Sequence, residues 1–187
     1  MFPSHRHERD AVDQAQRAFA VPRETGPRRR GFLVWEKRLP IGNDYVIELD
    51  PGGPVFHVDG RLLRVRESLT ITDEHGAEAL RIQGQLLDAR NVLAVVRDGV
   101  TLATVRKQTD EAGGELYVVD LPGAERVEVL GDPAERAYRL AYRTAIVATI
   151  SKAWRPLRTG YHARVVSEQD DAVVLAVTVC LDVMSRP

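Results

Sequence analysis

The chain has 187 residues, with 26 Lys and Arg against 27 Asp and Glu, which gives a formal net charge of -1 at pH 7. Its length suits one well-packed domain, and its near-neutral charge argues against a general nucleic-acid binder, whose affinity comes from positive charge over the whole surface. The single cysteine, Cys180, excludes an internal disulfide framework and a cysteine-based zinc site.

Residues 1–31 differ in composition from the rest of the chain. Apolar residues recur at helical spacing and predict a short amphipathic helix: Ala11, Val12, Ala15, Ala18 and Phe19. Residues 21–31 then contain two prolines, two glycines and an arginine triplet, a composition typical of a linker. Because short lone helices are only marginally stable in water, we expect residues 1–31 to form a flexible tail, with a docked helix as the alternative.

From residue 32 to residue 187 the sequence predicts one β domain. Turn signals such as Pro51–Pro54, Asp59-Gly60, Asp73–Gly76 and Asp98-Gly99 separate short apolar runs. The expected strands are residues 45–49, 55–58, 62–66, 69–71, 79–83, 92–96, 101–106, 116–121, 126–130, 138–142, 144–150 and 161–166. Ten to twelve short strands predict a sandwich or a barrel, and the lack of βα alternation argues against Rossmann and TIM-type folds.

The last apolar segment, Ala172–Leu181, is compatible with a helix or a strand. Asp170 and Asp171 stand where a helix N-cap and first turn favour carboxylates, and apolar residues on every side suit a helix buried all round. Four valines favour a strand instead. The segment is far shorter than the ~20 residues that a membrane-spanning helix needs. Since residues 1–20 also lack the apolar run of a signal peptide, we expect a cytoplasmic protein without a transmembrane segment.

The sequence offers no recognisable catalytic or cofactor motif. The five histidines have no metal-ligand spacing, and Pro51–Pro54 lacks the lysine and hydroxyl residue of a phosphate-binding loop. Ser151 and Lys152 are adjacent, so on a strand they would point to opposite faces. We therefore expect no metal, no cofactor and no enzymatic activity.

Charge is distributed unevenly along the chain. Residues 110–135, the acidic segment, carry a net charge of -7, and residues 136–167, the basic segment, carry +7 with no acidic residue. Strand alternation places Arg139 and Arg143 on one face, and it places His162 and Arg164 together likewise. The seven cations of the basic segment are Arg136, Arg139, Arg143, Lys152, Arg155, Arg158 and Arg164. Lys152, Arg155 and Arg158 are expected in the loop that connects the last two strands.

Two interpretations of this pattern stay open. The acidic segment could pair with the basic segment across neighbouring strands, which is favoured because strands adjacent in sequence usually pair. Alternatively, the basic segment forms an anion-binding face for a phosphoinositide headgroup, an anionic membrane or an acidic partner.

From about residue 32 to residue 183 the chain resembles the LURP-one-related family, whose fold is the tubby C-terminal-like fold shared with phospholipid scramblases. The strongest stretch is Val147–Trp154, which is similar to the family's "VA-x-ISK" strand and the aromatic residue after it, followed by Tyr161–Val165. Asp170–Asp182 resembles the family's closing "D-x-x-L-x-x-A-x-x-x-x-D" pattern, and Phe56–Gly60 and Thr70–Gly76 match two earlier blocks. The resemblance leaves out the first 31 residues.

The resemblance implies a closed antiparallel β-barrel of roughly twelve strands around a central C-terminal helix, with Ala172–Val183 as that helix and Cys180 buried. Tubby-like relatives bind membrane phosphoinositides, whereas no calcium loop of the scramblase kind is recognisable here. We therefore expect a non-enzymatic cytoplasmic scaffold, peripheral to the membrane, that binds anionic phospholipid or a phosphorylated ligand; a protein-interaction or oligomerisation module is the alternative. The candidate anion-binding residues are Lys152, Trp154, Arg155, Arg158, Arg139, Arg143 and Arg164, with Trp154 as a stacking or interfacial anchor.

Overall fold

The structure, a computed structural model, describes residues 5–22, 28–38, 43–63, 66–84, 91–111, 113–155, 158–166 and 168–185. Its elements in chain order are α1 (His5–Ala18), β1 (Arg29–Arg38), β2 (Asn43–Asp50), β3 (Pro54–Leu63), β4 (Arg66–Asp73), β5 (Glu78–Gly84), β6 (Val92–Arg97), β7 (Val100–Thr109), β8 (Glu115–Asp120), β9 (Arg126–Asp132), β10 (Ala137–Tyr142), β11 (Ala145–Arg155), β12 (Arg158–Val166) and α2 (Asp171–Met184).

The strands form one closed antiparallel barrel. Each strand pairs with its neighbours in sequence, and β1 closes the ring by pairing with β12 from Arg29 opposite Val166 to Trp35 opposite Gly160. Inward and outward residues alternate along the strands, so one side of each strand faces the core. The predicted twelve-strand barrel is therefore confirmed.

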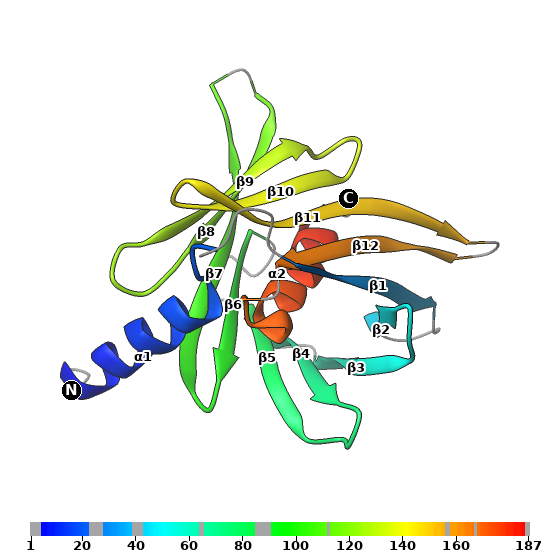
Figure 1. Cartoon of the computed structure of the whole chain (residues 1–187), viewed down its shortest axis with the longest axis horizontal. Coiled ribbons are helices and arrows are strands. Elements are labelled where there is room, and N and C mark those ends of the chain that lie inside the picture. The colour runs from blue at the N-terminus through cyan, green and yellow to red at the C-terminus, as the bar shows by residue number, and fades with distance from the viewer. Residues whose placement is uncertain are drawn as a thin grey trace.

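Helix α2 fills the centre of the barrel (Figure 1). Twelve of its 14 residues are buried, and Asp170 caps it by accepting a hydrogen bond from the backbone N–H of Val173. Because the barrel surrounds the helix, every side of it contacts apolar strand residues, and packing outweighs the β preference of its valines. This decides between the two interpretations of Ala172–Leu181 in favour of a helix. Cys180 is fully buried, as expected.

The N-terminal helix is docked, which differs from the flexible tail favoured by the sequence. Ala15, Ala18 and Phe19 are at most 1% exposed, and α1 packs against β7 and α2. The backbone also binds here: the Asp170 N–H donates to the Ala18 carbonyl, and Gln169 exchanges two hydrogen bonds with the Ala20 backbone. Tertiary contacts thus stabilise a helix too short to persist alone. β1 begins inside the predicted linker, whose residues 23–27 lie outside the described residues.

The turn predictions have mixed outcomes. Asp98 and Gly99 both have positive φ, 50° and 77°, as the expected two-residue hairpin between β6 and β7 requires. The turn at Asp59-Gly60 is wrong, because β3 runs straight through it with Asp59 opposite Thr70 and Gly60 opposite Leu69. Long-range pairing with β4 outweighs the local turn preference there. Residues 64 and 65 of the expected strand 62–66 lie outside the described residues.

Candidate basic surface

Six of the seven predicted site residues lie on three consecutive strands. Arg139 belongs to β10, Arg143 follows its end, and the other five lie on β11 or β12. The prediction that Lys152, Arg155 and Arg158 lie in a loop is therefore wrong. β11 and β12 stay paired out to Arg155 opposite Arg158. The hairpin that they form therefore continues beyond the last residue of β11 that pairs with β10.

Two of the arginines share the outer surface of the barrel. Arg139 lies opposite Thr149 on β11, and Thr149 lies opposite Arg164 on β12. Strands are about 4.8 Å apart, so the two arginine backbones are separated by about 10 Å. Both side chains are exposed, and neither forms an ion pair with another described residue. We call Arg139, Thr149 and Arg164 the outer arginine row.

Arg143 does not join this row, because it is neutralised locally. Its Nη2 lies 2.8 Å from Glu125 Oε1, and its guanidinium lies 5.2 Å from the centre of the Tyr142 ring. The hydrogen bond from Arg143 holds the pKa of Glu125 below its ordinary value. Arg143 also has a φ of 54°, in the tight turn between β10 and β11. Its role in the structure is that of a turn residue with its own counterion.

Most of the ion pairs of the acidic segment are formed with cations outside the basic segment. Asp120 binds Arg106 at 2.8 Å and Arg126 at 3.0 Å, and Glu115 forms an ion pair with Lys107. Within the described ranges, Glu125 with Arg143 is the one ion pair that joins the two segments. The favoured pairing of the two segments thus holds at a single contact, since β7 supplies two of the four cationic partners and β9 a third.

Lys152 and Trp154 lie on the opposite face of β11. Lys152 is opposite Tyr161, which points into the barrel, and Trp154 is opposite Thr159. The Lys152 Nζ lies 4.2 Å from the centre of the Trp154 ring, and Trp154 is 71% exposed. The structure therefore divides the predicted single site between two faces. The side chains of Arg155 and Arg158 lie outside the described part of the structure.

A buried polar cluster that the sequence did not reveal lies at the C-terminal end of α2. Asp182 accepts hydrogen bonds from the hydroxyls of Tyr45 at 2.8 Å and Tyr161 at 2.7 Å, and Arg136 Nη1 lies 3.7 Å from the same carboxylate. Burial raises the pKa of Tyr138 to about 12. In the sequence, the only indication of this cluster was a tyrosine at an inward position of each of β2, β10 and β12. The same pattern is equally typical of an apolar core, so it did not predict a buried carboxylate.

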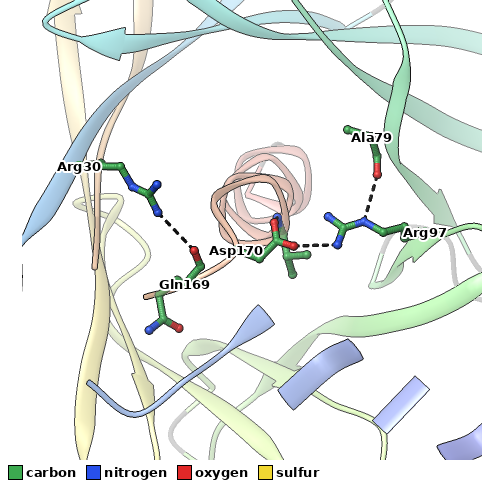
Figure 2. A network of polar contacts seen from close by, with 6 residues as sticks. Arg30, Ala79, Arg97, Gln169 and Asp170 are labelled. Carbon is green, nitrogen blue, oxygen red and sulfur yellow. Dashed lines mark hydrogen bonds and ion pairs between the residues drawn. The ribbon is translucent and has the colours of Figure 1, made fainter. Parts of the chain in front are cut away.

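The other end of α2 is tied to the barrel wall by two arginines that approach from opposite sides (Figure 2). Arg97 donates to Asp170 at 2.7 Å and to the Ala79 carbonyl at 3.3 Å. Arg30 donates to the Gln169 carbonyl and lies 2.8 Å from Asp171. Burial raises the pKa of Asp171 to about 6, against the opposing effect of Arg30. These contacts fix the helix rather than leave a cation available for a ligand.

No three His, Cys, Asp or Glu side chains among the described residues come together as a metal-binding group. No helix among those residues has both the length and the apolar character to cross a membrane.

Comparison with known proteins identifies a family and a solved structure that are similar to this chain. The model of the LURP-one-related family matches residues 30–182. The uncharacterised protein YxjI of Bacillus subtilis is 23% identical over 129 residues, covering 69% of this chain and 77% of that protein. A ribosomal protein L11 methyltransferase of Heliobacterium modesticaldum is 33% identical over 111 residues, but the match spans 54% of this chain and 35% of that protein. An X-ray structure of a protein from Arabidopsis thaliana, 19% identical, superposes with a TM-score of 0.64 over 94% of this chain and 98% of that one, which shows a shared fold.

Proposed function

The chain belongs to the LURP-one-related family, and on this basis we propose that it is a non-enzymatic cytoplasmic scaffold that binds anionic phospholipid at a membrane surface through the outer arginine row. One observation carries the proposal. Arg139 and Arg164 are exposed on neighbouring positions of one face, and neither has a carboxylate partner among the described residues.

The chemistry of the row suits phosphate. A guanidinium presents a planar fork of donors that matches phosphate oxygens, and two forks about 10 Å apart can contact one headgroup or two neighbouring ones. The Thr149 hydroxyl lies between them in register and offers a further donor. Each cation near an anionic membrane surface contributes about 1 kcal/mol, and the attraction decays over a Debye length.

The test is flotation of the full chain with liposomes. We expect binding to vesicles that contain phosphatidylserine or phosphoinositide and no binding to neutral vesicles, with weaker binding as salt rises from about 50 to about 150 mM. The double variant Arg139→Gln/Arg164→Gln should reduce the bound fraction about ten-fold or more, because it removes about 2 kcal/mol of attraction.

The matched control is Arg81→Gln/Arg126→Gln, which removes the same charge from the half-buried Arg81 and the exposed Arg126 and should leave flotation near the wild-type level. Soluble inositol phosphate, added as a competitor, separates headgroup recognition from attraction to a charged surface. Equal flotation with neutral vesicles, or equal losses in both double variants, would rule out the outer arginine row as the lipid site.

A further inference from the structure

The β11–β12 hairpin has an open edge along β11, and beyond Gly160, where β12 leaves β1, it is a two-stranded ribbon. β10 pairs with β11 as far as Tyr138 opposite Ile150, whereas β11 and β12 stay paired out to Arg155 opposite Arg158. Among the described strands, residues 151–155 of β11 therefore pair with β12 alone. Figure 1 shows this hairpin extending well beyond the body of the barrel. We call residues 151–155 the open edge.

Such an edge presents backbone N–H and C=O groups that are not paired with a neighbouring strand. In an antiparallel pair, alternate residues turn their N–H and C=O groups away from the partner strand. An unpaired row of this kind is a template for one more strand. Residues 59–63 of β3 and 129–132 of β9 also pair with one neighbour only, so the open edge is distinguished from these strand ends by its side chains.

The side chains beside the open edge have a distinct chemistry. Trp154 is 71% exposed, while the other exposed large apolar residues in the described part, Val21 and Leu130, are 38% and 39% exposed. Lys152 lies over the Trp154 ring, so the two form one contact surface on a single face of β11. No acidic residue occurs anywhere in the basic segment, so every formal charge on the ribbon strands is positive.

We propose that the open edge binds an extended acidic segment of a partner protein by strand addition. The added strand would pair its backbone with residues 151–155 and place alternate side chains on the face of Lys152 and Trp154. An acidic residue opposite Lys152 and an apolar residue opposite Trp154 would lie two positions apart in the ligand. The ligand class is thus a peptide in which acidic and apolar residues alternate at two-residue spacing.

Charge decides between a partner and a second copy of this chain. Two ribbons brought together at this edge would hold two sets of the cations Lys152, Arg155 and Arg158 close to one another with no acidic residue on either ribbon, and like charges repel. Positive residues on an edge are also a common protection against self-pairing. Protection alone does not account for Trp154, because an indole exposed beside an edge favours association.

This inference does not rest on the proposed lipid function, since the outer arginine row lies on the other face of β11. Arg139→Gln/Arg164→Gln should therefore leave peptide binding unchanged. Conversely, Trp154→Ala should weaken peptide binding and leave liposome flotation unchanged. If Trp154→Ala instead reduces flotation and not peptide binding, the ribbon is a membrane anchor and the peptide assignment is wrong.

The test uses the full chain and a labelled eight-residue peptide, Thr-Glu-Thr-Val repeated twice, with binding followed by fluorescence anisotropy. Hydrogen exchange should show protection of the backbone amides of 151–155 on peptide addition. The charge-reversed variant Lys152→Glu should bind the peptide about ten-fold more weakly and bind the matching Thr-Lys-Thr-Val peptide more tightly than wild type does. Lys152 is exposed, so this variant should keep the fold.

A peptide N-methylated at alternate residues provides the matched backbone control, because it keeps the side chains and loses the donors on one side. It should fail to bind. The proposal is overturned if the unmodified peptide does not bind, if the N-methylated peptide binds equally well, or if binding occurs without protection of residues 151–155.

Discussion

Gly160 lies where β12 runs closest to β1. A Cβ at this position would clash with the Val34 carbonyl oxygen and would stand 2.6 Å from the Trp35 ring. Both atoms belong to a paired strand and a side chain that is 2% exposed, so neither can move away easily. The absence of a side chain at Gly160 thus lets the barrel close and lets β12 continue into the ribbon.

We expect Gly160→Ala to lower the free energy of unfolding by about 1–3 kcal/mol, because overpacked positions in this range force backbone shifts. For a chain of this length the melting temperature should fall by about 2–4 °C for each kcal/mol. Gly53→Ala is the matched control, since nothing lies within 4 Å of its Cβ position. Equal melting temperatures for the two variants would contradict the close approach of β1 and β12.

At the residue scale, the sequence correctly predicted which face of the strands two arginines occupy, but it did not predict which residues form ion pairs and buried hydrogen bonds. The exposure of Arg139 and Arg164 follows from strand alternation alone. The ion pair between Arg143 and Glu125, two residues 18 positions apart, depends on how two turns meet. The buried contacts of Asp182 depend on two strands, β2 and β12, and the turn before β10 converging on one helix end. Such contacts can be predicted only once the strand order and the positions of the turns are known.

At the scale of elements, the N-terminal end of α2 joins four parts of the chain. Arg30 comes from β1 and Arg97 from β6, while Ala18 and Ala20 bring the end of α1 to the residues that precede the helix. The cap and the apolar sequence left this segment open between a helix and a strand, and the family resemblance predicted the helix. The docking of α1 could not, because its partners on β7 and α2 are distant in sequence.

Asp171 makes the stability of this end depend on pH. Burial raises its folded-state pKa from 3.8 to about 6, so the folded state takes up a proton at a pH where the unfolded chain does not. The contribution of Asp171 is therefore most favourable when it is protonated, and it is lost as pH rises through about 6. The full effect is at most about 3 kcal/mol.

We expect Asp171→Asn, which removes the charge, to be more stable than wild type at pH 7 by about 1–3 kcal/mol. The difference in melting temperature should shrink as pH falls from about 6 and vanish near pH 4. Chemical denaturation at several pH values measures it. A difference that stays constant from pH 4 to pH 7 would mean that the Asp171 carboxyl does not titrate in this window.

At the scale of the whole molecule, the near-zero net charge conceals two segments of opposite sign. Antiparallel pairing places the acidic strand β8 beside β7, whose cations neutralise two of its carboxylates, and it places β10, β11 and β12 together with Arg139 and Arg164 facing outward. The twelve-strand count and the central helix could be expected from the sequence and the family resemblance. The separation of the basic residues onto two faces followed only when β11 and β12 proved longer than expected.

The barrel depends on its central helix, and Val177 lies at the middle of that helix with no exposed surface. We expect Val177→Asp to abolish soluble expression, because an unpaired carboxylate in this position costs several kcal/mol against a total stability of about 5–15 kcal/mol. Val177→Ala should remain folded with a stability loss of about 1–3 kcal/mol, which keeps the test quantitative. Val183→Asp, on the same helix but only partly buried, controls for the charge and should be milder. Equal melting temperatures for wild type and Val177→Ala, together with a soluble and cooperatively folded Val177→Asp, would show that the barrel does not need its helix as a core.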